Sequence, residues 1–184
     1  MLKEAAVVSL VHRARRLRRP DILLAMELWR RKQVVREIAL DDEALMQLAF
    51  VAAQTSPNRI RKVGAAILIC DDGAPIAACN TFPKGVADLD ERHAGDGRFV
   101  WMEHAERNAI FTAARAGRAL AGGRIASTLF PCVDCARAIV ISGIETLVTY
   151  PPPLDDPVWG ASFPRSRIIL EEGGVELVFL NPKP

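Results

Sequence analysis

The stretch "RIASTLFPCVDCARAIVISGIETLVTY", residues 124–150, predicts a strand, a helix and a second strand in succession. Apolar and β-branched residues dominate both ends of this stretch, as is typical of strands. The apolar residues of "CVDCARAIVIS" recur at helical spacing, and Gly143 is suited to closing that helix. A strand–helix–strand order is typical of an α/β domain.

The segments on either side extend the same pattern. Upstream, "LDDEALMQLAFVAAQTS" predicts an amphipathic helix, and "VGAAILIC", "DDG" and "APIAACN" predict a strand, a tight turn and a strand. A long polar connection without periodicity, residues 81–99, leads to a helix predicted over 103–115. Downstream, a loop, the helix "RSRIILEEG" and the strand "VELVFL" follow. We therefore predict an α/β fold of three α/β/α layers around a central mixed sheet of about five strands.

Charge divides the chain into two parts. Residues 1–36 contain ten Lys and Arg against three Asp and Glu, whereas the remainder carries a net charge of −5. We predict a basic extension of two helices, 1–19 and 21–37, before one domain at 37–184. The extension could contact the domain or another subunit, could bind nucleic acid, or could reflect a later start of translation near Met26. The acidic domain favours a protein that does not bind nucleic acid, since a non-specific polyanion binder would more often be basic throughout.

Composition also predicts the compartment. No apolar run approaches the roughly 20 residues that cross a bilayer, and "HRARRLRR" follows "EAAVVSLV" where a secretory signal would need a cleavage site. With four cysteines in such a chain, metal binding or buried thiols are favoured over disulfides. We predict a cytoplasmic protein in which Cys70 and Cys79 are buried thiols.

Three side chains are candidate metal ligands. Cys132 and Cys135 lie three residues apart at the start of a helix, so both sulfurs project from one face of its first turn. His104, at the start of the preceding helix, can supply a third ligand. A structural zinc site needs a fourth protein ligand, whereas three ligands and an open position are typical of catalytic zinc with a bound water. Glu106 then suits a proton carrier between that water and a leaving amine.

Each half of this motif is ambiguous when taken alone. Cys-x-x-Cys could be a redox pair, half of a structural zinc site or two core thiols, and His-x-Glu is common by chance. Their conjunction, with Pro131 before the first cysteine, matches the H-x-E…P-C-x-x-C signature of zinc deaminases.

From about residue 41 to 180, the chain resembles the cytidine/deoxycytidylate deaminase superfamily and looks most like its deoxycytidylate (dCMP) deaminase branch. The blocks that carry the resemblance are "RKVGAAIL", "NTFPKGV", "DERH", "HAERNAI", "TLFPCVDCARAIVISGIETLV" and "GASFPRSRIILEEGGVEL". The resemblance implies a cytidine-deaminase-like fold and hydrolytic deamination at cytosine C4 by water activated on Zn²⁺.

The resemblance also implies roles for individual residues. His104, Cys132 and Cys135 would bind zinc, and Glu106 would shuttle protons. The Ala105 N–H would hold the pyrimidine O2, the Phe130 carbonyl would receive the exocyclic amine, and Asn80 would bind the sugar. For a phosphate we favour Arg61 and Lys84 among the basic residues that border such a site (Arg59, Arg61, Lys62, Lys84 and Arg98). Trp159 and Phe163 could close over the base, or could pack in the core or against another subunit.

The resulting prediction is a homo-oligomeric zinc hydrolase that converts the small pyrimidine nucleotide dCMP to dUMP and ammonia. Three alternatives remain open: a deaminase of another small base or nucleoside, such as cytidine or a modified pyrimidine, a polynucleotide-editing deaminase, and a non-catalytic zinc-binding relative. We expect His93 to be a solvated loop histidine rather than a ligand of a second metal.

Overall fold

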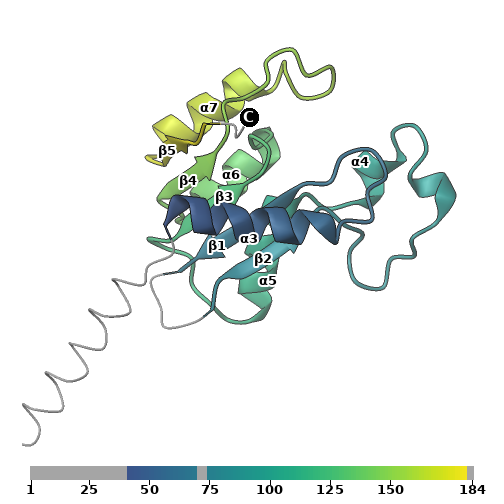
Figure 1. Cartoon of the computed structure of the whole chain (residues 1–184), viewed down its shortest axis with the longest axis horizontal. Helices are drawn as coiled ribbons and strands as arrows, with labels where there is room; N and C mark the ends of the chain where they lie inside the picture. The colour runs from purple at the N-terminus through teal and green to yellow at the C-terminus, as the bar shows by residue number, and fades with distance from the viewer. Residues whose placement is uncertain (1–40, 70–73, 182–184) are drawn as a thin grey trace, which may run out of the picture. The chain divides into compact units, whose positions relative to one another are not determined.

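The computed structural model describes residues 41–69 and 74–181 (Figure 1). The two helices predicted over 1–19 and 21–37, Cys70 and the turn at 71–73 lie outside these residues. None of the described helices is both long and apolar enough to cross a bilayer.

The described elements follow the predicted order of helix, hairpin and alternating helices and strands. They are α3 (Asp42–Gln54), β1 (Gly64–Leu68), β2 (Ile76–Cys79), η1 (Asp90–Arg92), α4 (Gly97–Trp101), α5 (Ala105–Arg115), β3 (Arg124–Ser127), α6 (Val133–Ile141), β4 (Thr146–Thr149), α7 (Phe163–Glu172) and β5 (Glu176–Phe179).

The sheet has five strands in the order β2-β1-β3-β4-β5. Strand β1 runs antiparallel to both β2 and β3, whereas β3, β4 and β5 are parallel to one another. The crossovers from β3 to β4 and from β4 to β5 contain α6 and α7, as parallel connections require. The predicted mixed five-stranded sheet is confirmed.

Successive residues of β1 face opposite layers of the molecule. Ala65 and Ile67 belong to a core cluster with side chains from α5, α6 and α7. Ala66 belongs to a second cluster with buried residues of α3, which crosses the sheet in Figure 1. Both faces of β1 are therefore covered, as its apolar sequence predicts, and the three-layer α/β/α arrangement is confirmed.

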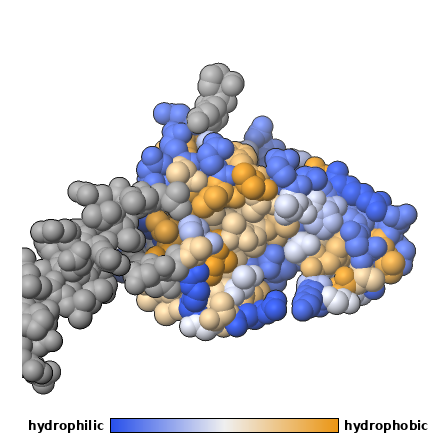
Figure 2. All heavy atoms as spheres, turned by 60° about the horizontal axis from the view of Figure 1, so that its bottom comes forward, coloured by the Kyte–Doolittle hydropathy of each residue, from blue (hydrophilic) through white to orange (hydrophobic). Residues whose placement is uncertain are grey.

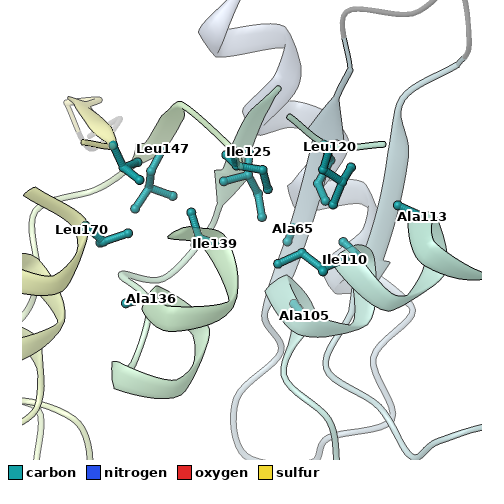
Figure 3. Close-up of a cluster of buried hydrophobic side chains, with 14 of the residues drawn as sticks. Ala65, Ala105, Ile110, Ala113, Leu120, Ile125, Ala136, Ile139, Leu147 and Leu170 are labelled. Carbon is teal, nitrogen blue, oxygen red and sulfur yellow. The ribbon is translucent and has the colours of Figure 1, made fainter. Parts of the chain in front are cut away.

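The larger core cluster holds helices α5, α6 and α7 against the sheet. Figure 3 shows Ile139 of α6 and Leu170 of α7 directed toward Leu147 of the sheet, with Ile110 of α5 beside Ala65. Because these side chains are almost fully buried, their packing sets where α5 and α6 begin relative to the strands.

Two features of the 81–101 segment differ from the prediction. It contains the short helices η1 and α4, which at three and five residues are too short to show periodicity in the sequence. His93 is buried rather than solvated, so that expectation is wrong: its Nε2 lies 2.5 Å from Asp88 Oδ1, and its ring meets the Phe82 ring edge-on at 5.3 Å.

Candidate active site

The three expected ligands meet at the starts of two helices. His104 directly precedes α5, Cys132 directly precedes α6, and Cys135 lies in the first turn of α6. The His104 Nδ1 atom is 3.4 Å from Cys132 Sγ and 3.5 Å from Cys135 Sγ. In the part of the chain that the structure describes, these three form the one group of potential metal donors within 4.8 Å of one another.

The backbone around His104 differs slightly from the sequence prediction. Helix α5 begins at Ala105 rather than Glu103, so His104 has an extended backbone conformation (φ −74°, ψ 153°). Glu106 is therefore the second residue of the helix. The side chains of His104 and Glu106 point in different directions because the backbone changes from extended to helical between them.

Glu103 holds His104 in place, a role that sequence reasoning missed. Its Oε1 accepts hydrogen bonds from the His104 backbone N–H (2.9 Å) and from Arg107 Nε (2.6 Å). Its backbone pairs with Thr81 through hydrogen bonds of 2.8 and 3.1 Å. The i,i+4 spacing of Glu103 and Arg107 was the available signal.

The donor set fits zinc. With Zn–S and Zn–N bonds of about 2.3 and 2.05 Å, a tetrahedral ion would place a nitrogen and a sulfur donor about 3.6 Å apart. The observed separations of 3.4 and 3.5 Å come close to this value. One imidazole and two thiols are also a donor combination that binds zinc in catalytic sites with one open position.

Interactions within the group separate the two thiol pKa values. The hydrogen bond from Cys135 is the main cause that lowers the pKa of Cys132 to about 4, and His104 lowers it further. The same hydrogen bond, followed by burial, raises the pKa of Cys135 well above its usual value. One sulfur is thus already a thiolate at neutral pH, which is the form that binds a metal.

Glu106 lies beside this group without belonging to it. Its side chain is buried (3% exposed), and its Oε2 is 3.5 Å from Cys135 Sγ. Burial is the main cause that raises the pKa of the Glu106 carboxyl. A carboxyl with a raised pKa, placed where water is excluded, is suited to accepting and returning protons.

A cavity of about 270 Å³ adjoins the group, near the lower end of the range for small-molecule sites. It combines an apolar wall with a few polar side chains. Its lining residues include His104, Ala105, Glu106, Cys132, Phe130, Asn80, Arg61, Arg98, Phe99 and Trp159.

Four of the five expected substrate contacts lie in this wall. Asn80, Ala105, Phe130 and Arg61 all line the cavity. Lys84 lies on an exposed turn and is absent from the lining, whereas Arg98 is present.

The amide of Asn80 also has a structural role. Its Oδ1 accepts hydrogen bonds from Val63 N and Ser56 Oγ, both at 2.8 Å, and its Nδ2 donates to the Arg61 carbonyl at 2.9 Å. Asn80 therefore holds the segment that brings Arg61 to the cavity.

The two candidate aromatic residues have different positions. Phe163 is 1% exposed and packs edge-on against Phe130 in the core. Trp159 lines the cavity, and its ring meets the His104 ring edge-on at 5.2 Å. Only Trp159 is therefore placed to contact a ligand.

Residues 40–150 match the family model described as the cytidine and deoxycytidylate deaminase zinc-binding region. The chain belongs to this deaminase family. The match covers every member of the His104–Cys132–Cys135 group as well as Glu106.

Relatives of this deaminase that are named as deoxycytidylate deaminases include proteins of animals and phages. It is 29% identical over 147 residues to a probable deoxycytidylate deaminase of Drosophila melanogaster, covering 73% of this chain and 70% of the relative. It is 35% identical over 124 residues to the deoxycytidylate deaminase of Mycobacterium phage D29, and this match covers 60% of this chain and 93% of the phage protein. A dCMP deaminase of the cyanophage S-TIM5, solved in complex with dCMP and dUMP, shares the fold of this deaminase: the TM-score is 0.60 at 23% identity, with 75% of this chain and 95% of the phage chain covered.

Proposed function

We propose that this protein is a zinc-dependent deaminase that hydrolyses dCMP to dUMP and ammonia. The observation that carries the proposal is the buried Glu106 beside the His104–Cys132–Cys135 group at the wall of one small cavity. Membership of the deaminase family and relatives named as deoxycytidylate deaminases support the same chemistry and the same substrate.

We assign His104, Cys132 and Cys135 as the residues that hold zinc. A zinc ion in such a site lowers the pKa of a bound water and makes it a nucleophile at neutral pH. Two of the three ligands, His104 and Cys132, line the cavity, so a zinc ion held by this group would lie beside the space in which a base would bind.

Glu106 is the proton carrier in this proposal. Its carboxylate would take a proton from the attacking water and pass it to the ring nitrogen N3. It would then take the second proton from the hydroxyl group on C4 and pass it to the amino group, which leaves as ammonia while the C4 carbonyl forms. The exclusion of bulk water around this buried side chain makes it the local proton acceptor and donor.

Backbone groups orient the base. Ala105 is the first residue of α5, where a helix N–H has no intrahelical partner, so it is free to donate to the pyrimidine O2. The Phe130 carbonyl would accept a hydrogen bond from the exocyclic amine, and Asn80, which also lines the cavity, would contact the sugar.

The 5′-phosphate is assigned to the arginines of the cavity wall. Arg61 and Arg98 both line the cavity and present planar guanidinium groups that match phosphate oxygens. The Arg98 guanidinium lies 4.2 Å from the centre of the Phe99 ring, which restricts its orientation. Arg98 replaces Lys84 in this role because Lys84 lies outside the wall.

A substrate panel tests the proposal. Zinc-loaded protein is assayed for ammonia release from dCMP, CMP, deoxycytidine, dCTP and a cytosine-containing oligodeoxynucleotide, with Glu106→Gln protein as the control for contaminating enzymes. We expect dCMP to have the highest kcat/KM, roughly tenfold or more above deoxycytidine, since a hydrogen bond to a charged group contributes about 1.5–3 kcal/mol. Equal kcat/KM values for dCMP and deoxycytidine would refute the assignment of a nucleotide substrate. The absence of any deamination would refute the proposed enzymatic activity.

We also propose that the protein is a homo-oligomer. Helices α5, α6 and α7 expose large apolar residues, namely Phe111, Ile141 (83% exposed) and Ile168. Figure 2 shows apolar side chains gathered on one face of the molecule and bordered by hydrophilic ones. Light scattering of the wild type against Ile141→Lys tests this proposal, and a monomeric wild type would refute it.

We place the protein in the cytoplasm. A pair of cysteines that must stay reduced to bind metal is maintained in a reducing compartment. Cell fractionation followed by detection of the full chain tests this assignment.

A further inference from the structure

The loop between β4 and α7 contains a buried carboxylate, Asp156, whose side chain is only 5% exposed. Its Oδ1 accepts hydrogen bonds from the backbone N–H groups of Val158 (2.9 Å) and Trp159 (2.8 Å). Its Oδ2 lies 2.5 Å from Nη1 of Arg61. Both oxygens are thus engaged, one by the loop itself and one by a residue 95 positions earlier.

The charge state of this carboxyl follows from these contacts. Burial alone would raise the pKa of Asp156, but hydrogen bonds from Trp159 and Val158, and the Arg61 guanidinium, outweigh that effect and hold the pKa below its usual value. Asp156 is therefore ionised at neutral pH and forms charge-assisted hydrogen bonds, which are the stronger kind.

The turn that Asp156 closes forms one wall of the cavity. Pro157, Val158 and Trp159 all line it. The Trp159 ring meets the His104 ring edge-on at 5.2 Å and the Phe99 ring edge-on at 5.5 Å. The position of Trp159 thus decides how much room a base has beside His104.

Polar contacts centred on Asp156 hold this turn. Its backbone N–H donates to the Pro153 carbonyl (3.0 Å), and its carbonyl accepts from Gly160 N (2.9 Å). The side chains of Leu154 and Val158 are 65% and 42% exposed, so apolar burial contributes little to fixing the segment.

The other oxygen of Asp156 orients Arg61. The Arg61 side chain is 41% exposed, and a long side chain with this exposure would otherwise sample many rotamers. Because a guanidinium is planar, a carboxylate on Nη1 restricts the directions in which its remaining N–H groups point.

We infer that Asp156 is a positioning residue for substrate: one carboxylate holds the Trp159 wall beside His104 and also aims the Arg61 guanidinium into the cavity. The inference rests on the proposed function and deepens it. It links recognition of the base and recognition of the phosphate through a single side chain that touches neither.

Two substitutions of Asp156 separate these effects in the full-length, zinc-loaded protein. Asp156→Asn keeps an oxygen for the two loop N–H groups but removes the negative charge that faces Arg61. Asp156→Ala removes both. Asp155→Ala is the matched control, because Asp155 is its exposed neighbour in the same loop.

The kinetic expectation is a different pattern for each variant. Asp156→Asn should raise KM for dCMP about tenfold, with kcat and the kcat/KM for deoxycytidine changed less than about threefold. Asp156→Ala should in addition lower kcat roughly tenfold on both compounds, since Trp159 is then no longer held. The Asp155→Ala variant should match the wild type.

Hydrogen exchange provides a readout that does not depend on turnover. The amides of Val158 and Trp159 should exchange roughly tenfold faster in Asp156→Ala than in Asp155→Ala, and close to the wild-type rate in Asp156→Asn. Equal exchange and equal kinetics for the two alanine variants would overturn the inference. An equal loss of kcat in Asp156→Asn and Asp156→Ala would overturn it as well.

The inference and the proposed function can fail separately. A wild type that deaminates no compound in the panel refutes the proposed function. The exchange rates of Val158 and Trp159 then decide by themselves whether Asp156 positions the wall.

Discussion

Replacing Glu106 by Gln should separate proton transfer from metal binding and folding. Gln has nearly the same shape as Glu, and its amide N–H can donate to the Cys135 sulfur, which lies 3.5 Å from Glu106 Oε2 and is a thiolate when it binds a metal. The change leaves no void in the wall of the cavity. It does remove the ability to accept a proton and return it.

The size of the effect follows from the burial of this residue. General acid–base groups typically contribute about 10²–10⁴-fold to a rate, which corresponds to about 2.7–5.4 kcal/mol in the barrier. Because Glu106 is only 3% exposed, bulk water cannot easily take over its role, so we expect kcat to fall toward the larger end of that range. The KM for dCMP should change less than about threefold, since the shape of the cavity is preserved.

Steady-state ammonia release and metal content by elemental analysis are measured on the same preparations. Glu172→Gln, the same chemical change on the exposed face of α7, is the control. Zinc content equal to the wild type with a kcat within tenfold of it would refute the assignment of Glu106. Loss of zinc would instead indicate that Glu106 belongs to the ligand set.

Three further changes test other parts of the structure. Cys132→Ala should reduce zinc content from about one ion per chain to almost none and lower the melting temperature, because metal binding stabilises the folded state; elemental analysis and calorimetry would contradict this if zinc remained. Gly64→Ala should destabilise the fold by about 3 kcal/mol or more, since a Cβ there would overlap the backbone of Ala49 in α3, and an unchanged urea midpoint would exclude that contact. The pKa of Asp156 is lowered by folding, so its stabilising effect is present above the unfolded-state pKa of about 3.9 and is lost as the pH falls through the folded-state value. The difference in unfolding free energy between wild type and Asp156→Asn should therefore narrow from pH 6 to pH 3, and a constant difference would contradict the ion pair.

Local sequence signals predicted the sheet, and they also singled out the three potential donors that the structure brings together. The hairpin, the order of helices and strands, and the three donors depend on residues close together in sequence or on a motif with fixed spacing. Helix starts at Ala105 and Val133 place His104 and Cys132 in similar positions. The sequence predicts both helices, but with starts two residues and one residue too early, at Glu103 and Cys132.

Contacts between distant segments could not be predicted in the same way. Arg61 and Asp156 are 95 residues apart, and each looks like a surface charge in its own segment. His93 is buried because Asp88 and the Phe82 ring happen to fold around it. Arg98, rather than the expected Lys84, lines the cavity because it lies in the short helix α4, and this helix has no periodic signal in the sequence.

The His104–Cys132–Cys135 group and the part of the cavity wall that contains Arg61 and Trp159 come from different kinds of structure. His104, Cys132 and Cys135 lie at the starts of helices that pack on a five-stranded sheet, whereas Arg61, Trp159 and their neighbours belong to connecting segments. Loops tolerate substitution, insertion and deletion far better than packed helices do. A homologue could therefore acquire a preference for another nucleobase by altering a few connecting residues, while the His104–Cys132–Cys135 group and Glu106 are inherited intact.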